Sequence, residues 1–193
     1  SSKKRVLDIG CAFGYALDEA KKRGFDVSGV ETSKYSRAYA KNILKLNIFN
    51  DINIVIKKKL SFDLIFIIGT IEHFTDPKTI LKKAESLLSK NGILLITTIN
   101  TSGFFPLYSL KPPEHIFYFS DKNLNILLNK CGLTKIKHKT YFTNYFLYDV
   151  IHRLGAFFKF GLLIQFSKFI KKNFPNMYGK IPTNEMVFIV KKT

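Results

Sequence analysis

Val6-Leu7-Asp8-Ile9-Gly10-Cys11-Ala12-Phe13-Gly14 is a short apolar run that ends in a loop of small residues, and a helix-forming segment follows it directly. A strand, a small-residue loop and a helix in this order place backbone N–H groups at the carboxyl edge of a sheet, with no bulky side chains over them. Such an edge suits a nucleotide-like ligand. Dehydrogenases and purely structural turns share the pattern, so the loop alone does not identify the ligand.

Beyond this loop the chain alternates apolar runs of strand length with segments whose apolar residues recur at helical spacing. Strands that alternate with helices form a parallel sheet with helices on both faces. We therefore predict an α/β fold with a Rossmann-like, doubly wound, mostly parallel sheet. The predicted strands are 5–9, 25–30, 48–50, 62–68 and 93–99. The predicted helices are 15–23, 32–46, 77–91 and 121–131.

An acidic residue, Glu31, stands at the end of the second predicted strand, about 20 positions beyond the loop. In Rossmann-type sites a carboxylate at this point accepts hydrogen bonds from the two ribose hydroxyls. An exposed surface glutamate is the alternative. Strand context and spacing together favour a ribose-binding role.

The segment Gly69-Thr70-Ile71-Glu72-His73-Phe74-Thr75-Asp76-Pro77 follows the apolar run 62–68, and a helix, Asn91-Gly92 and another strand come after it. Together with Asp8-x-Gly10-x-Ala12-x-Gly14, this order resembles class I S-adenosylmethionine-dependent methyltransferases of the type 11 and type 23 groups, which include quinone-biosynthesis O-methyltransferases. The resemblance covers roughly residues 5 to 135. Ala12 departs from it, since that family usually has glycine there.

The resemblance implies S-adenosylmethionine as the cofactor and S-adenosylhomocysteine as the product. It also implies that the last strands, 134–142 and 186–191, pair antiparallel at one edge of the sheet. Asp8 would steady the loop and face an ammonium group, and Asp51 would lie near the adenine amino group. The predicted cofactor-binding residues are Asp8, Gly10, Cys11, Ala12, Gly14, Glu31, Thr32, Asp51, Ile52, Gly69 and Thr70.

Two histidines, His73 and His115, fall in loops expected on the cofactor side of the sheet. Methyl transfer to a hydroxyl is helped by a general base, and histidine suits this role because its unperturbed pKa lies near neutrality. We predict His115 and His73 as catalytic residues, with a structural role as the alternative for each. In some quinone-pathway relatives the Glu-His pair joins further carboxylates on a divalent cation. Gly69 stands where the additional acid would be, so we predict no metal.

The formal net charge of +17 comes almost entirely from lysine. Nucleic-acid recognition favours arginine interleaved with exposed aromatic residues, and this chain has only Arg5, Arg23, Arg37 and Arg153. The charge alone therefore does not indicate a nucleic-acid partner. The two cysteines form neither a disulfide framework nor a metal-ligand pattern, which favours a reducing, cytoplasmic setting. We expect no leader peptide and no membrane span, and the early first strand suggests that an amino-terminal segment has been removed.

An insertion, 144–183, interrupts the predicted methyltransferase domain, which comprises 1–143 and 184–193. Its stretch Leu154 to Ile170 is apolar on nearly every face, with Lys159, Gln165 and Lys168 interspersed. This pattern suits an amphipathic helix on a membrane surface, and it equally suits a lid over the substrate. The sequence therefore predicts a peripheral membrane contact or a lid, and it leaves the oligomeric state open.

The function that these patterns favour is methyl transfer to a small-molecule acceptor, an apolar, quinone-like, lipid or sugar hydroxyl. A nucleic-acid methyltransferase is an alternative supported only by charge, since the chain lacks an Asn/Asp-Pro-Pro-Tyr segment and a Pro-Cys nucleophile. A domain that binds S-adenosylmethionine without catalysis is another alternative, which Ala12 permits.

Overall fold

The computed structural model of the chain describes residues 3–102 and 112–193, apart from the side chains of 141, 143 and 181–184. Most of the segment between the strand ending at Ile99 and His115 lies outside the described residues. The chain divides into two compact units, which we call the sheet unit, Ser1–Lys139 with Asn184–Thr193, and the hairpin unit, Thr140–Thr183.

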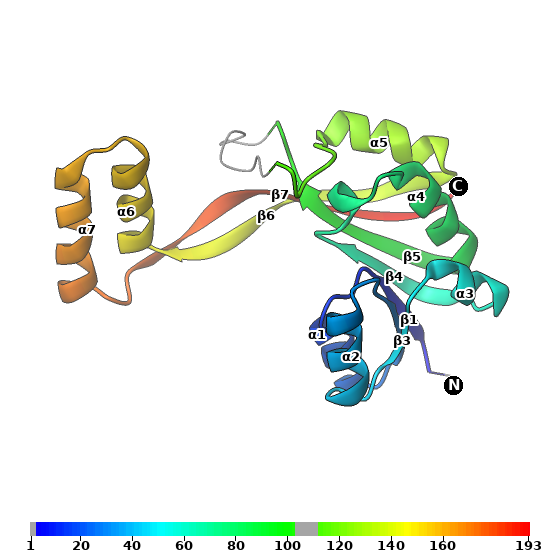
Figure 1. Cartoon of the computed structure of the whole chain (residues 1–193). Coiled ribbons are helices and arrows are strands. Elements are labelled where there is room, and N and C mark those ends of the chain that lie inside the picture. Colours follow the sequence, from blue (N-terminus) through cyan, green and yellow to red (C-terminus); the bar gives the residue numbers. More distant parts are fainter. Residues whose placement is uncertain (1–2, 103–111) are drawn as a thin grey trace. The chain divides into compact units, whose positions relative to one another are not determined.

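In the part of the chain that the structure describes, seven strands form one sheet in the order β3-β2-β1-β4-β5-β7-β6 (Figure 1). The five strands from β3 to β5 pair in parallel, and β7 runs antiparallel to β5. This confirms the predicted mostly parallel, doubly wound sheet with an antiparallel strand. The strands are β1 (Arg5–Ile9), β2 (Asp26–Val30), β3 (Asn47–Phe49), β4 (Phe62–Ile68), β5 (Leu88–Ile99), β6 (Leu133–Phe146) and β7 (Tyr178–Lys192).

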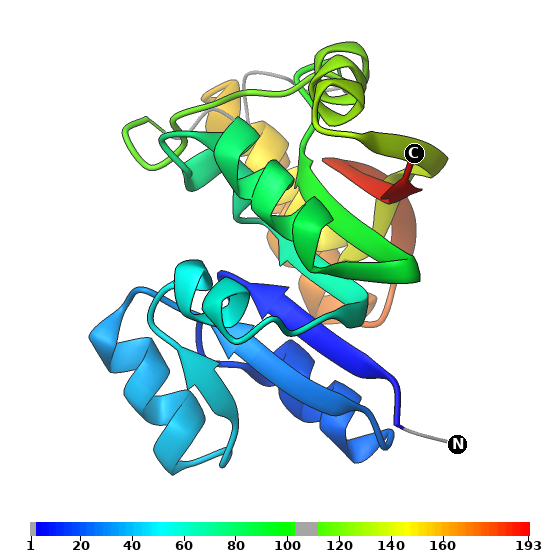
Figure 2. The same cartoon turned by 90° about the vertical axis from the view of Figure 1, so that its right-hand side faces the viewer.

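The helices of the sheet unit cover both faces of the sheet (Figures 1 and 2). Alternation along β1 explains this: Leu7 and Ile9 pack in one core cluster, and Val6 packs in the other. The first cluster includes residues of α3, α4 and α5, and the second includes residues of α1 and α2. The helices are α1 (Tyr15–Lys22), α2 (Lys34–Asn42), α3 (Ile52–Lys57), α4 (Pro77–Leu87), α5 (Asp121–Lys130), α6 (Leu147–Phe157) and α7 (Gly161–Asn173), with a 3₁₀ turn η1 (Ile71–His73).

Three parts of the structure differ from the sequence expectations. The pair Asn91-Gly92 lies within β5 and does not close α4, because Leu88 is already extended and pairs with Phe62. Helix α3 was not predicted, although Asp51 caps it. The apolar stretch Leu154 to Ile170 is not one helix: α6 ends at Phe157, and Lys159 adopts a left-handed backbone conformation with φ of 53° before α7 begins.

Within the described residues, no helix has the length and apolar character needed to cross a membrane. Both cysteines are free thiols, and both are buried.

Candidate active site

The loop after β1 wraps around the end of β2. The backbone N–H groups of Gly10 and Cys11 both donate to the carbonyl oxygen of Val30, at 2.8 and 3.1 Å. Three loop residues have left-handed backbone angles: Gly10 with φ of 81°, Ala12 with 47° and Gly14 with 83°. Ala12 therefore adopts a conformation that favours glycine, at a cost of roughly 1–2 kcal/mol.

Glu31 fastens this loop to the end of β2. Its Oε2 accepts a hydrogen bond from the backbone N–H of Ala12 at 2.8 Å, and its Oε1 accepts one from Ser33 at 2.6 Å. The main-chain oxygens of Glu31 and Thr32 both accept from the Arg37 guanidinium. An ionised carboxylate has about four acceptor sites, so Glu31 retains capacity for further donors such as hydroxyls.

Asp8 lies at the base of the loop and is 3% exposed. Its Oδ1 is buried and has no hydrogen-bond partner among the residues that the structure describes. Burial, and secondarily the nearby Glu31 carboxylate, raise the pKa of Asp8 to about 7. An unpartnered buried carboxyl oxygen is suited to a cationic ligand, which would both donate to it and favour its ionised form.

In Cys11 the backbone N–H takes part in the hydrogen bonding of the loop, whereas, among the described residues, the thiol does not. Burial, followed by the Asp8 and Glu31 charges, raises the pKa of this thiol to about 12, so it stays protonated. Its sulfur packs so closely under β2 that a Cβ on Gly29 would lie 2.7 Å from it. The thiol is therefore part of the core.

The Thr70 side chain lies directly against Gly10, where any Cβ would overlap it. Thr70 is held there because its hydroxyl donates to the Ile68 carbonyl oxygen at 2.8 Å. The Gly69 N–H donates to the main chain of Thr97 at the end of β5. The contact between Thr70 and Gly10 brings together the loop after β1 and the segment after β4, as the sequence predicted for one edge of a parallel sheet.

Asp51, at the end of β3, has a structural partner of its own. Its Oδ1 accepts from the Asn53 N–H at 2.8 Å and so caps α3, and this bond is the main cause that holds the pKa of Asp51 below its usual range. Ile52 is buried under the sheet, and Thr32 is exposed. All three follow strands that end at the same edge as β1.

A second group at this edge consists of Glu72, His73 and His115. Glu72 is buried and connects several elements: its Oε2 accepts from the Thr98 hydroxyl at 2.8 Å, and its main-chain oxygen accepts from the N–H groups of residues 116 and 117. This tether explains why His73 and His115, distant in sequence, have ring centroids 4.9 Å apart.

The two histidines differ in what their ring nitrogens can do. His73 is exposed, and its Nδ1 lies 2.6 Å from the Glu114 carbonyl oxygen. A carbonyl can only accept, so Nδ1 carries the hydrogen and Nε2 is the acceptor in the neutral ring. His115 is only 9% exposed, and its Nδ1 is buried with no hydrogen-bond partner within residues 3–102 and 112–193.

One ligand atom from each of Glu72, His73 and His115 can be chosen so that all lie within 4.8 Å of one another. One carboxylate and two imidazoles suit a first-row transition metal better than Mg²⁺. The predicted absence of a metal relied on Gly69 replacing an acid. His115 supplies a third potential ligand in place of that acid, so the glycine at position 69 does not by itself exclude a metal.

Sequence reasoning missed an aromatic cluster beside the loop, formed by Phe13, Tyr15, Tyr35 and Tyr39. The Phe13 ring centroid lies 5.3 Å from that of Tyr39 and 5.9 Å from that of Tyr35. The Tyr15 and Tyr39 hydroxyls are 3.3 Å apart. The available signal was the spacing of Tyr35 and Tyr39, which share one helix face.

Residues 1–138 match the family model of a methyltransferase domain. The chain belongs to this methyltransferase family. It is 32% identical over 120 residues to a ubiquinone biosynthesis O-methyltransferase of Coxiella burnetii, an alignment that covers 59% of this chain and 51% of that protein. A ubiquinone biosynthesis O-methyltransferase of Pelagibacter ubique is 31% identical over 117 residues, covering 58% and 49%. The chain thus spans about half the length of the curated relatives that it matches.

Solved structures of methyltransferases share the fold. A S-adenosylmethionine-dependent methyltransferase from Archaeoglobus fulgidus superposes with a TM-score of 0.69 at 20% identity, covering 99% of this chain and 87% of that one. The plantazolicin methyltransferase BpumL, solved in complex with S-adenosylhomocysteine, gives a TM-score of 0.63 at 19% identity, covering 100% and 77%. The family match and the shared fold place the chain in a methyltransferase family with a Rossmann-like fold, as the sequence motifs indicated.

Proposed function

We propose that this methyltransferase transfers a methyl group from S-adenosylmethionine to a hydroxyl oxygen of a small apolar molecule. The observation that carries the proposal is the contact between Thr70 and Gly10. It joins the loop fastened by Glu31 to the segment that presents His73. A donor-binding loop and a candidate base therefore share one edge of the sheet.

The residues of the loop fit S-adenosylmethionine. Asp8 offers a buried, unpartnered oxygen to the ammonium group of the methionine part, and Glu31 offers acceptor capacity to the ribose hydroxyls. We assign Asp51 and Ile52, which follow β3 at the same edge of the sheet, to the adenine. When bound, S-adenosylmethionine supplies an electrophilic methyl group, and the protein's task is to orient an acceptor in line with it and to exclude water.

His73 is the residue that we assign to the acceptor proton. It is exposed, and its Nδ1 hydrogen bond to Glu114 leaves Nε2 with the lone pair that takes a proton as the oxygen attacks. His115 packs against His73 from the buried side, and we assign it to the same catalytic group. Glu72 holds both in place.

A quinone-like acceptor is supported by the curated relatives, which are named for ubiquinone biosynthesis. Because the chain aligns with only about half of each relative, the relatives support a class of acceptor and do not identify the acceptor itself. Lipid and sugar hydroxyls are the alternatives within the same reaction.

Isothermal titration tests cofactor binding directly. We expect S-adenosylmethionine and S-adenosylhomocysteine to bind and NAD not to bind. Glu31→Ala should weaken binding by roughly 1–3 kcal/mol, the scale for losing a charged hydrogen-bonding partner. Glu19→Ala, which removes an exposed carboxylate of α1 paired with Arg23, is the matched control. Binding of NAD, with no heat from either adenosyl ligand, would contradict the proposal.

A further inference from the structure

The hairpin unit is a pair of helices whose inner faces are well packed. Gly155 of α6 lies so close to α7 that a Cβ there would be 3.0 Å from both the Leu163 side chain and the Ile164 backbone. His152 and the buried Ser167 hydroxyl lie 3.2 Å apart across the same contact. The two helices therefore bury small and aliphatic residues between them, and most of the unit's phenylalanines are left outside.

The large apolar side chains of this unit gather at the turn and along one face of α7. Leu162, Phe166 and Phe169 follow one another at intervals of four and three residues, which places them on a single helix face. At the turn, Phe157 and Phe158 are each 67% exposed, and Leu162 is 68% exposed. We call this set the aromatic surface; its members are Phe157, Phe158, Phe160, Leu162, Phe166 and Phe169.

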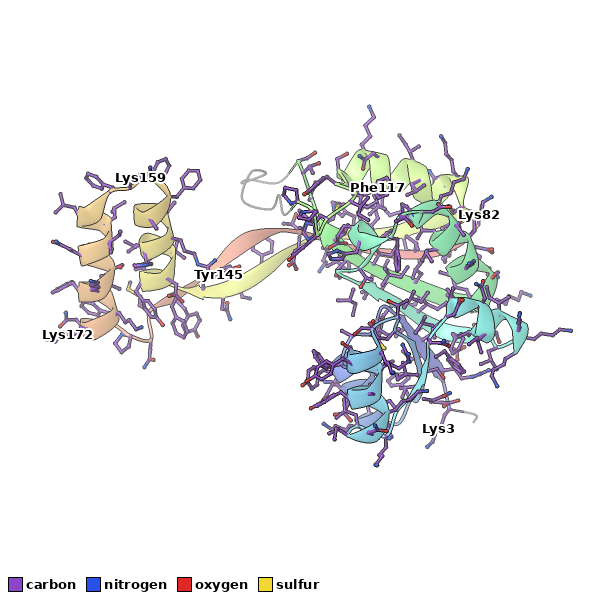
Figure 3. The ribbon with its side chains drawn as sticks, viewed as in Figure 1. Lys3, Lys82, Phe117, Tyr145, Lys159 and Lys172 are labelled. Atoms are coloured by element: carbon purple, nitrogen blue, oxygen red, sulfur yellow. The ribbon has the colours of Figure 1, made fainter. Side chains whose placement is uncertain are left out.

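Lysines border the aromatic surface. Lys159 lies at the turn between the helices, and Lys172 lies at the other end of α7 (Figure 3). Lys168 and Lys172 are four residues apart, so they share the helix face next to the apolar stripe. Six basic residues of the hairpin unit (Arg153, Lys159, Lys168, Lys171, Lys172 and Lys180) contrast with one acid, Asp149.

We propose that the aromatic surface inserts into the interface of a bilayer that contains anionic phospholipid. Phenylalanine and leucine favour the boundary between headgroups and acyl chains, and neighbouring lysines are attracted to anionic headgroups. Helix α7 has 13 residues and is about 20 Å long, which is too short to cross the hydrocarbon core. The hairpin unit therefore lies in the interface.

A second copy of the chain is a poorer occupant for the same surface. Self-association would bring Lys159, Lys168 and Lys172 of one copy against those of the other, within a chain of net charge +17. Like charges held together across an interface oppose binding. An anionic bilayer matches both the apolar and the cationic parts of the surface. This inference does not depend on the proposed reaction.

Vesicle flotation of the intact chain tests the inference. We expect co-flotation with vesicles of 70% phosphatidylcholine and 30% phosphatidylglycerol, and little with phosphatidylcholine alone. Replacing Phe158, Phe160 and Leu162 together with serine should abolish flotation. The matched control replaces two exposed isoleucines of the sheet unit, I43S/I126S, and should float like the unaltered protein.

Charge is tested with a variant that leaves the apolar side chains in place. The variant K159Q/K168Q/K172Q should lower the partition coefficient on anionic vesicles on the order of 100-fold, since each lysine near the surface contributes about a factor of five. The variant K57Q/K58Q/K59Q removes the same charge from an exposed run of the sheet unit and should change the coefficient far less. Circular dichroism checks that each variant is folded.

Three results would overturn the inference. The first is an unaltered protein that does not float with anionic vesicles. The second is an equal loss of flotation in the two lysine variants, which would indicate attraction by total charge alone. The third is a stable dimer in sedimentation velocity that dissociates in the triple serine variant, which would assign the aromatic surface to a second copy.

Discussion

Replacing Asp8 with asparagine should remove a pH dependence of stability that the buried carboxyl creates. Asp8 is protonated in the folded protein up to a pKa of about 7, whereas the ordinary pKa of aspartate is 3.8. Between these values the folded state binds more protons than the unfolded state, so this group makes the unfolding free energy fall as pH rises. Its contribution is most favourable below pH 3.8 and reaches its least favourable value above pH 7.

The magnitude follows from the two pKa values. A full shift from 3.8 to about 7 corresponds to about 4 kcal/mol of unfolding free energy, and about 2.5 kcal/mol of this is lost between pH 5 and pH 8. Asparagine has nearly the same shape and does not titrate. The difference in stability between the unaltered protein and Asp8→Asn should therefore shift by about 2.5 kcal/mol over that range, in favour of the variant at pH 8.

Urea unfolding of both proteins at pH 5, 6, 7 and 8 measures this difference. Asp26→Asn, at an exposed carboxyl that starts β2, controls for the loss of a negative charge. Parallel pH profiles for the unaltered protein and Asp8→Asn would refute the reasoning. A second measurement follows binding: S-adenosylhomocysteine should bind the unaltered protein more tightly at pH 8 than at pH 6, because its ammonium group favours the ionised carboxyl, and Asp8→Asn should lose that dependence.

Two further predictions concern the same edge of the sheet. Gly10→Ala should cost the backbone penalty of a positive φ plus the overlap with Thr70, at least 2 kcal/mol in all, and should eliminate binding of S-adenosylhomocysteine. Gly24 also has a positive φ, but apart from its chain neighbours no atom of the described residues lies within 4 Å of an added Cβ. Gly24→Ala should therefore cost about 1 kcal/mol and leave binding intact. Equal losses of stability for the two variants in thermal unfolding would argue against the contact between Gly10 and Thr70. Turnover with a hydroxylated quinone precursor should resist a chelator if His73 acts as a base without a metal, and it should fall at least 100-fold in His73→Gln. Activity lost to the chelator and restored by a divalent cation would instead make Glu72, His73 and His115 metal ligands.

The sequence was most informative where a residue's role depends on strand order. Parallel strands end at one edge, so the positions of Gly10, Glu31 and Thr70 followed from the alternation of strands and helices. The side-chain partners did not follow. Asp51 caps a helix that the sequence did not reveal, and the unpartnered oxygen of Asp8 depends on packing from several elements.

The pairing of His73 with His115 shows a second limit. The sequence placed each histidine in a loop on the cofactor side of the sheet. The spacing of the residues could not show that the main-chain oxygen of Glu72 accepts hydrogen bonds from the N–H groups of residues 116 and 117. In the insertion, composition indicated an amphipathic element but not two helices. The left-handed backbone at Lys159, a residue type that seldom adopts it, was not foreseeable from hydrophobic periodicity.

The position of β7 between β5 and β6 has a consequence for how the protein folds during synthesis. β7 provides Met186, Phe188 and Val190, all fully buried, and these residues leave the ribosome after every other strand. Until then the nascent chain has an unpaired apolar edge on β5, a known starting point for aggregation. This edge of β5 therefore stays open to pairing with another extended chain until β7 has emerged and docked on it.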